Sequence, residues 1–390
     1  MYDVYEIRKD FPELALTVNG RPNTYLDTAA SALKPEAVVE KMMSFYRMHY
    51  SNVHRGAYYL SEQATAEYEK ARETVARSAT ESINLAAASW GMHNLKPGDE
   101  ILLSEAEHHA NLVPWQMVRD QTGCTLNFFA VNDDGSFNPE NFYRALTPRT
   151  KLVGVAGISN VLGTVFPVKE IAAAAHANGA LCLVDACQSV VHQKIDVKDI
   201  GCDFLAFSGH KTYGPTGIGV LYGRYELLAA MPPYQTGGDM VKSVTLQHTE
   251  FAEPPARFEA GTPAIAEAVG LGAALEYMSR LGMENIAAHE KALMDYALMR
   301  LAEIPELKVV GTAPDKGGVI AFALGSIHPQ DVAFVLDKEG VAIRTGHHCA
   351  EPIVNRMGYT SLARASFGLY TTKEDIDRFV AALNKAKSFF

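Results

Sequence analysis

Short apolar runs alternate with helix-like segments between about Thr80 and Gly261. The runs have the length and the continuous apolar character of strands that are buried on both faces of a sheet: DEILLSEAE, TLNFFAV, TKLVGVAGIS, GALCLVDA, CDFLAFSG and GIGVLYG. Between them, NLVPWQMVRDQTG and VKEIAAAAHANG have helical spacing, and Gly179 ends the second segment as a helix C-cap would. Strands separated by helices predict βαβ units and a mostly parallel sheet.

The pattern changes after Gly261. The stretch from Ala264 to Ile304 is rich in Ala, Leu, Met and Glu at helical spacing, which predicts a long helical connector. Beyond it, LKVVG, GVIAFAL and GVAIR predict strands, and PQDVAFVLDKEG and KEDIDRFVAALNKAKSFF predict helices. We therefore expect a large α/β domain and a smaller C-terminal one, without internal repeats or low-complexity segments.

Composition narrows the function classes. The 390 residues are 48% hydrophobic and 21% charged, as in a globular protein with a large core. A formal net charge of −10 without a basic run argues against binding to nucleic acid or to an anionic membrane surface. The first residues, MYDVYEIRKDFPEL, contain no apolar signal-peptide segment, and no apolar stretch of membrane-spanning length occurs. The five cysteines are scattered and odd in number, unlike a disulfide framework, so we expect a cytoplasmic protein.

A lysine in a glycine-rich turn and an aspartate at a strand end form the first candidate site. Lys211 lies in SGHKTYGPTGIG, directly after FLAFS, and Asp185 ends the run LCLVD. Taken singly, such a lysine is usually a surface residue and such an aspartate usually caps a helix. A right-handed crossover, however, brings both strand ends to the sheet edge where ligands bind. There the pair offers what pyridoxal 5'-phosphate (PLP) requires, an amine for its aldehyde and an anion for its pyridine nitrogen.

The segment SATESINLAAASW suggests a site for the cofactor's phosphate. Ser78 and Glu81 fit a capping box, so that a helix begins here with free N–H groups, and Thr80 adds a hydroxyl. A simple helix cap without a ligand would be the interpretation if the motif stood alone. Ser208 and His210, which flank the lysine turn, could supply further hydrogen-bond donors.

A series of motifs follows in order from about Leu26 to Tyr370: TYLDTAASALKP, NVHRGAYYLSEQAT, SATESINL, EHHANLVPWQ, ISNVLGT, VDACQS, FSGHKTYGPTGIGVLYG, FEAGTP, RTGHHCAEP and ARASFGLY. Together they resemble the PLP-dependent cysteine desulfurases of aminotransferase class V, fold type I, in the SufS-type (group II) branch. The resemblance implies an α/β fold with a mainly parallel central sheet flanked by helices. It also implies a large PLP-binding domain of residues 17–283 and a small domain, of residues 1–16 and 284–390, that carries a catalytic cysteine loop.

The resemblance also implies a role for individual residues. His108 would stack on the pyridine ring and carry protons, although a histidine taken alone is more often a core residue. Further cofactor contacts are implied for Lys211, Asp185, Gln188, Asn160, Thr80, Glu81, Ser208 and His210, and for Thr262 at the phosphate of a neighbouring subunit. Substrate contacts are implied for Arg364, which would hold the carboxylate, and for Asn160, Ala30, His54, Arg55 and Arg344.

The motif RTGHHCAEP places Cys349 behind two histidines. A metal site is disfavoured, because adjacent residues rarely converge on one centre and no second ligand pair accompanies them. An inert buried cysteine would lie within an apolar run, as Cys182 does. Arg344 and a helix N-terminus expected after Pro352 both favour the thiolate form. The resemblance implies that Cys349 takes the sulfur of L-cysteine as a persulfide while alanine leaves.

The implied partners are a second copy of the chain, a sulfur-acceptor protein of the SufE or SufU type and a scaffold for iron–sulfur cluster assembly. A selenocysteine lyase has the same PLP site and stays open as an alternative. A kynureninase-like lyase is disfavoured because its chemistry does not require RTGHHCAEP. A non-enzymatic scaffold is disfavoured because Lys211, Asp185, His108, Arg364 and Cys349 are all present.

The sequence departs from the family pattern at two places. Arg77 runs directly into Ser78, where the pattern has a further stretch with a buried strand. Either the chain carries a true deletion or the printed sequence lacks residues that the protein has. We favour the second, because losing a core strand would expose backbone groups and apolar surface, and an intact mass would decide. In DACQS, Cys187 replaces a small residue and is expected to pack against the sheet.

Overall fold

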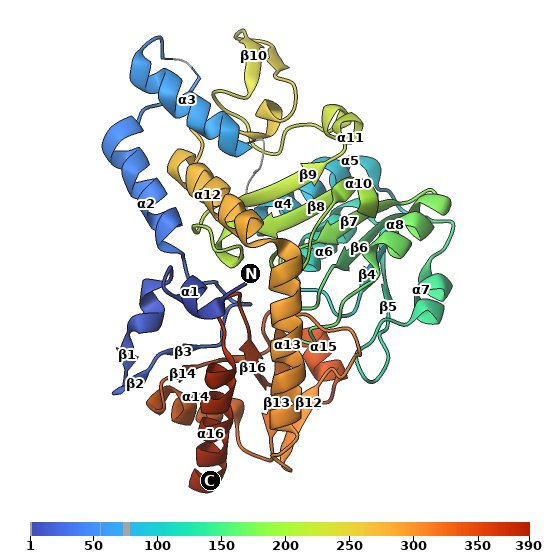
Figure 1. Ribbon diagram of the computed structural model, residues 1–390. Helices are drawn as coiled ribbons and strands as arrows, with labels where there is room; N and C mark the ends of the chain where they lie inside the picture. Colours follow the sequence, from blue (N-terminus) through green and yellow to red (C-terminus); the bar gives the residue numbers. More distant parts are fainter. Residues whose placement is uncertain (1, 55, 73–78) are drawn as a thin grey trace.

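The computed structural model describes residues 2–54, 56–72 and 79–390. A six-stranded sheet, in the order β5-β4-β6-β7-β8-β9, is the larger of the sheets (Figure 1). Its strands are β4 (Glu100–Ser104), β5 (Thr125–Phe129), β6 (Thr150–Ala156), β7 (Leu181–Asp185), β8 (Phe204–Ser208) and β9 (Gly219–Gly223). All neighbours are parallel except β8 and β9. The six predicted strands and the mostly parallel sheet are confirmed.

Helices cover both faces of this sheet because successive side chains of each strand point to opposite sides. From β4, Leu102 belongs to the buried cluster that contains Ile171 of α8 (Val168–Ala177). Its neighbours Ile101 and Leu103 belong to the opposite cluster, with Trp115 of α6 (Val113–Thr122). Each fully buried aliphatic side chain contributes about 2 kcal/mol by leaving water. This double burial explains why the strands read as continuous apolar runs rather than as alternating ones.

The predicted connector consists of two helices, α12 (Ile265–Leu281) and α13 (Met283–Leu301). They are separated at Gly282, whose φ of +84° lies in the region that favours glycine. Helix α12 packs against α2 (Glu36–Ser44) and α3 (Tyr59–Arg72). Helix α13 runs from there toward the smaller sheet (Figure 1). The connector is therefore helical as expected, but it is not one continuous helix.

The second sheet is antiparallel, with the strand order β12-β13-β16-β15. Its strands are β12 (Leu307–Val310), β13 (Val319–Leu324), β15 (Arg344–Gly346) and β16 (Leu362–Ser366), and helices α14 (Pro329–Lys338) and α16 (Lys373–Phe389) flank it. The prediction of one strand over GVAIR is wrong. Val341–Ala342 forms β14 and pairs with β3 (Thr24–Tyr25), whereas Arg344 begins β15 and pairs with Arg364 of β16. The chain therefore changes partners within the predicted strand.

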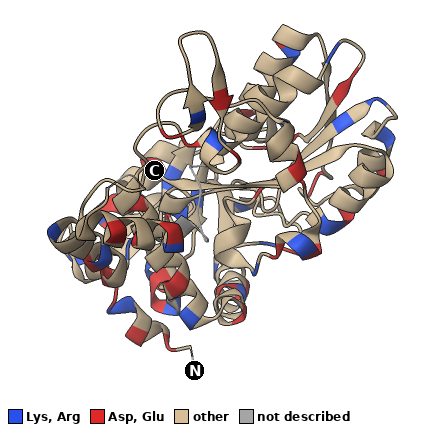
Figure 2. Cartoon of the chain, turned by 90° about the horizontal axis from the view of Figure 1, so that it is seen from above, with Lys and Arg blue, Asp and Glu red and all other residues tan. Residues whose placement is uncertain are grey.

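The remaining elements are short: α1 (Val4–Arg8), η1 (Pro12–Ala15), β1 (Thr17–Val18), β2 (Arg21–Pro22), η2 (Phe45–His49), α4 (Ala79–Leu85), η3 (Ala86–Gly91), α5 (Met92–Asn94), η4 (His109–Asn111), α7 (Pro139–Ala145), α9 (Ser189–His192), α10 (Val197–Ile200), η5 (Gly209–Lys211), α11 (Tyr225–Ala230), β10 (Val241–Val244), β11 (Thr249–Phe251), η6 (Ala256–Phe258) and α15 (Glu351–Arg356). Acidic and basic residues are interspersed on the surface helices rather than separated into faces (Figure 2). Across the described residues, every helix is too short or too polar to cross a membrane.

Candidate active site

Lys211 and Asp185 both lie at the carboxyl edge of the large sheet. Asp185 is the last residue of β7, which pairs in parallel with β8, and Lys211 ends the short helix η5 that follows β8. The Asp185 carboxylate is 5% exposed and accepts a 3.0 Å hydrogen bond from the Cys187 backbone N–H. Among the described residues, no Lys, Arg or His lies within ion-pair distance of this carboxylate. A buried carboxylate without a cationic partner is costly, so the site suits a ligand that brings a positive charge.

His108 faces the same two groups. Burial, and after it the charge of Lys211, lowers the pKa of the His108 imidazole to about 4, while Asp185 opposes this shift. Its Nδ1 accepts a 3.0 Å hydrogen bond from the Ala110 backbone N–H, so the neutral ring carries its proton on Nε2. His108 is therefore a neutral hydrogen-bond donor near pH 7.

The residues expected to bind the cofactor's phosphate include one at the same sheet edge. Ser208 ends β8, and its Oγ accepts a 3.2 Å hydrogen bond from the backbone N–H of Ala79, the first residue of α4. Thr80 is the next residue of that helix and is exposed. Burial, followed by the charges of Lys211 and Lys34, lowers the pKa of His210 to about 4, so His210 is neutral as well. The predicted capping box includes Ser78, which lies outside the described residues.

Taken together, these groups fit PLP. Lys211 provides a primary amine that makes no hydrogen bond or ion pair with the other described residues, and Asp185 provides an anion that lacks a cation. His108 provides a flat ring, and Ser208 and Thr80 provide hydroxyls beside a helix start. The side-chain amides of Gln188 and Asn160, two further predicted site residues, donate hydrogen bonds to backbone carbonyls. Gln188 Nε2 donates to Ala29 O at 2.9 Å, and Asn160 Nδ2 donates to His348 O at 2.7 Å.

Arg364 lies in the centre of β16, with its side chain 1% exposed. Its Nη1 donates to Asn160 O at 3.0 Å and its Nη2 to Asp27 Oδ1 at 3.1 Å, whereas its Nε has no partner among the described residues. Burial lowers the pKa of Arg364 and raises that of Asp27, and their ion pair offsets part of both shifts. Ala30 adjoins them, since its backbone N–H donates to Asp27 O at 3.0 Å. A buried guanidinium whose Nε–H has no partner among the described residues is suited to a substrate carboxylate.

Cys349 occupies a strained turn between β15 and α15. His348 and Cys349 have φ of +53° and +57°, a region that costs a residue other than glycine about 1–2 kcal/mol. Arg344 Nη2 lies 3.9 Å from the Cys349 Sγ. Cys349 is partly exposed, whereas the other four cysteines are buried. Burial raises the pKa of Cys187, one of those four, to about 12, which agrees with the expectation that it packs against the sheet.

Two predicted site residues lie together at a different place. His54 lines a cavity of about 220 Å³ with Gly261 and Pro263, which flank Thr262. His54 Nε2 lies 2.6 Å from Glu69 Oε1. No hydrogen bond or ion pair among the described residues joins His54 or Thr262 to the Lys211 group. Arg55 lies outside the described residues. On the exposed side of α4, Glu81 Oε1 accepts a 3.5 Å hydrogen bond from Gln235 Nε2.

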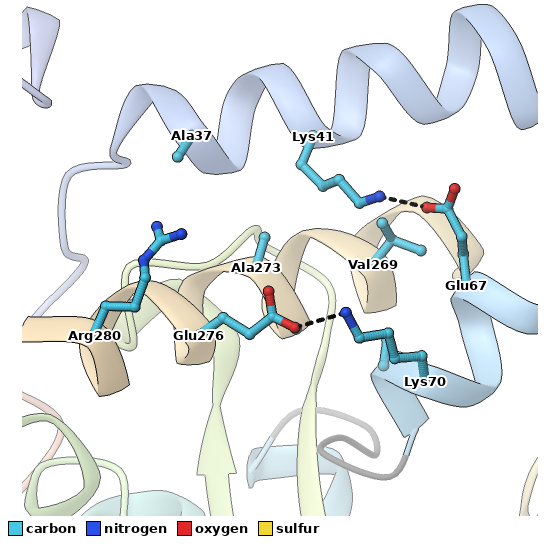
Figure 3. Close-up of a pocket in the computed structure, with 10 residues that line it drawn as sticks. Ala37, Lys41, Glu67, Lys70, Val269, Ala273, Glu276 and Arg280 are labelled. Atoms are coloured by element: carbon cyan, nitrogen blue, oxygen red, sulfur yellow. Dashed lines mark hydrogen bonds and ion pairs between the residues drawn. The ribbon is translucent and has the colours of Figure 1, made fainter.

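A separate groove of about 200 Å³ lies between α2, α3 and α12 (Figure 3). Two ion pairs cross it, Lys41 to Glu67 at 2.7 Å and Lys70 to Glu276 at 3.0 Å. The groove is lined by none of the residues predicted to act on cofactor or substrate. Its small apolar side chains and its two ion pairs are typical of a helix–helix junction.

Three residues of the site were not predicted from the sequence: Asp27, Glu107 and His109. Asp27 pairs with Arg364, as described above. Glu107 is wholly buried, and its two oxygens accept from Asn111 Nδ2 at 2.8 Å and from the Ala156 backbone N–H at 2.9 Å. Burial raises its pKa to about 8. The sequence offered one usable indication, namely that these residues lie inside the motifs TYLDTAASALKP and EHHANLVPWQ.

The similarity of this chain to known proteins extends over nearly its whole length. The aminotransferase class-V family model matches residues 24–379. A cysteine desulfurase of Dickeya dadantii is 50% identical over 98% of this chain and 97% of its own length. The cysteine desulfurase CsdA of Escherichia coli has a TM-score of 0.92 at 38% identity, over 100% of both chains. The apo cysteine desulfurase of Thermococcus onnurineus has a TM-score of 0.94 at 36% identity, over 99% of this chain and 98% of its own.

Within the described residues, the carboxyl edge of this sheet carries a lysine without a hydrogen-bond partner, an aspartate without a cationic partner and a neutral histidine, the groups of a PLP-dependent enzyme of fold type I. The chain belongs to the aminotransferase class-V family and, within it, to the PLP-dependent cysteine desulfurases. The alignment with the Dickeya protein extends over 399 residues, against 390 in this chain, so that relative has residues without a counterpart here.

Proposed function

We propose that this enzyme converts L-cysteine to L-alanine and receives the substrate's sulfur on Cys349 as a persulfide. The observation that carries the proposal is the Cys349 turn, which presents the one partly exposed cysteine of the described chain beside the guanidinium of Arg344. A nearby positive charge stabilises a thiolate, the reactive form of cysteine. The buried Arg364 and the neutral His108 lie on the elements around this turn.

Each side chain then has a task in the reaction. Bound PLP supplies an electron sink for the charge that develops at Cα of the substrate. Asp185 holds the proton on the pyridine nitrogen, and Arg364 binds the substrate carboxylate through its free Nε–H. Lys211 moves the Cα proton. Lys211 or His108 then returns the protons that complete alanine.

The sulfur moves by nucleophilic attack. The Cys349 Sγ attacks the sulfur of the substrate, and a new S–S bond forms as the Cβ–S bond breaks. The electron pair of the broken bond stays on the carbon fragment, which then takes up protons at Cβ and Cα and leaves as alanine. The persulfide remains on Cys349 until an acceptor thiol removes it.

The direct test is Cys349→Ala, with Cys124→Ala as a matched control at a buried cysteine of the same chain. We expect Cys349→Ala to lose cysteine-dependent alanine formation by at least about 100-fold while it retains its bound cofactor, as removal of a covalent nucleophile does. The control should keep its rate. Alanine formation by Cys349→Ala at the parent rate would rule out this role of Cys349.

The finer assignments belong to the same proposal. We assign the enzyme to the SufS-type branch, in the cytoplasm, as a homodimer that passes sulfur to a SufE- or SufU-type acceptor for iron–sulfur assembly. Support for a dimer comes from a run of exposed aromatic and thioether side chains, which are 50–69% exposed: Tyr46, Met48, Tyr50, Tyr58 and Tyr59. Further support comes from Thr262, which no hydrogen bond or ion pair among the described residues joins to Lys211 of its own chain. The proposed domain limits are residues 17–283 for the large domain, with 1–16 and 284–390 for the small one. Relative turnover of cysteine and selenocysteine distinguishes this function from a selenocysteine lyase.

A further inference from the structure

We propose that His109 is a positioning residue that clamps the Cys349 turn in its attack geometry, a role that rests on the proposed function. His109 was assigned no part in cofactor or substrate binding by the sequence motifs. It lies at the start of η4, directly after His108, and contacts the cysteine turn from the large domain.

The turn needs such a clamp because its backbone is strained. His348 and Cys349 are consecutive residues with positive φ, although neither is glycine or asparagine. Residues in this region persist only where the surrounding structure determines their conformation. Inside the turn, one backbone bond closes it, from Ala350 N to His347 O at 2.9 Å. The other restraints must therefore come from outside the turn.

His109 supplies two of those outside restraints, one on each side of Ala350. Its backbone N–H donates to the carbonyl of Cys349 at 2.7 Å. Its ring Nε2 accepts from the backbone N–H of Glu351 at 3.1 Å. Asn160 holds the preceding carbonyl, that of His348, at 2.7 Å. The Cys349 turn is thus held by the side chain of Asn160 and by the backbone N–H and the ring Nε2 of His109.

The ring contact acts as a helix cap provided by another segment. Helix α15 begins at Glu351, and its N-cap residue Ala350 has no side-chain oxygen to satisfy the first N–H groups. Pro352 at the next position has no N–H at all. The imidazole of His109 therefore supplies the acceptor that an N-cap serine or aspartate normally provides. To accept through Nε2, the neutral ring carries its proton on Nδ1.

The placement also links two parts of the site. His108 and His109 are adjacent, so the segment that carries the neutral ring toward Lys211 also holds the nucleophile's loop. Glu107, the preceding residue, fastens this segment to β6 through the Ala156 N–H. Displacing the His109 ring should consequently affect the attack by Cys349 more than the binding of cysteine.

The test compares two substitutions of similar size in the cofactor-loaded enzyme. His109→Gln places an amide oxygen near the position of Nε2 and can still accept from Glu351 N–H. His109→Asn places its polar group near the position of Nδ1 and cannot reach. The first readout is the rate at which iodoacetamide alkylates Cys349 without substrate, followed by peptide mass. The four buried cysteines serve as internal references. The second readout is kcat and KM for alanine formation at matched cofactor content.

We expect His109→Asn to slow alkylation and kcat by about tenfold with KM changed less than about twofold, and His109→Gln to stay within about threefold of the parent. Two results would overturn the proposal: a His109→Asn enzyme with the parent's alkylation rate and kcat, or equal losses in both variants. Either result leaves Cys349 as the nucleophile if Cys349→Ala is inactive. Alanine formation by Cys349→Ala would instead refute the proposed function itself.

Discussion

Acid should weaken this fold through His348, and the size of the effect follows from its surroundings. The side chain is 3% exposed, its Nε2 lies 3.1 Å from the carbonyl oxygen of Leu362, and its Nδ1 has no partner among the described residues. Burial is the largest cause that lowers the pKa of His348, and the charges of Arg364 and Arg344 lower it further, to about 3. The folded protein therefore holds this imidazole neutral.

The sign and magnitude of the effect come from proton linkage. In the unfolded chain a histidine has a pKa of about 6.5, so between pH 6.5 and 3 the unfolded state binds the proton and the folded state does not. The contribution of His348 to stability is fully present above pH 6.5 and is lost as the pH falls toward 3. At pH 5 the loss in the free energy of unfolding is about 2 kcal/mol for this single group.

The assay is urea unfolding of the parent and of His348→Gln at pH 8 and pH 5. Glutamine can still donate to the Leu362 carbonyl from the position of Nε2, but it does not titrate. We expect the parent to lose about 2 kcal/mol more than the variant between the two pH values. The control is His248→Gln, at an exposed position, which should lose the same free energy of unfolding as the parent between pH 8 and pH 5. Because His108 and His210 contribute equally to both proteins, parallel pH dependences of parent and His348→Gln would refute the reasoning.

Three further substitutions test the cofactor and substrate groups. Lys211→Ala should lose the visible absorbance of lysine-bound PLP in a spectrum of the purified protein, and persistence of that band would exclude the assignment. Asp185→Asn should weaken PLP binding by about 10- to 100-fold in a cofactor titration, because a charge-assisted hydrogen bond is worth about 1.5–3 kcal/mol. Arg364→Lys should raise KM for cysteine by about tenfold while absorbance is unchanged, since an ammonium cannot reproduce the guanidinium fork. An unchanged KM would place the substrate carboxylate elsewhere.

The apolar pattern predicted the central strands of the large sheet, β4, β6, β7 and β8, because those strands are buried on both faces. In the small sheet the same pattern predicted β12 and β13 but missed β16. β16 has Arg364 at its centre, so LARAS does not read as an apolar run, although all five of its residues are buried. A buried arginine is tolerated there because Asp27 and the Asn160 carbonyl pair with it. The sequence alone does not show that pairing, since the three residues are far apart in the chain.

The candidate site likewise contains residues that the sequence predicts and residues that it does not. Lys211 and Asp185 were found because the order of strands places their ends at one sheet edge, a rule that needs no coordinates. His109 was not found, because its role depends on two contacts across 240 residues of sequence, from His109 to Cys349 and Glu351. A side chain that acts on a remote backbone group leaves no pattern in its own segment.

The clamped turn also bears on how sulfur leaves Cys349. The carbonyls of His348 and Cys349 accept hydrogen bonds from Asn160 and His109, and α15 begins two residues after Cys349. A loop held this closely on both sides has few conformations in which the Sγ could move far from Arg344. A sulfur–sulfur exchange requires direct contact between the attacking thiolate and the persulfide. If the proposed function holds, an acceptor has to bring its own thiol to this turn, and we expect it to bind the surface around α15 and η4.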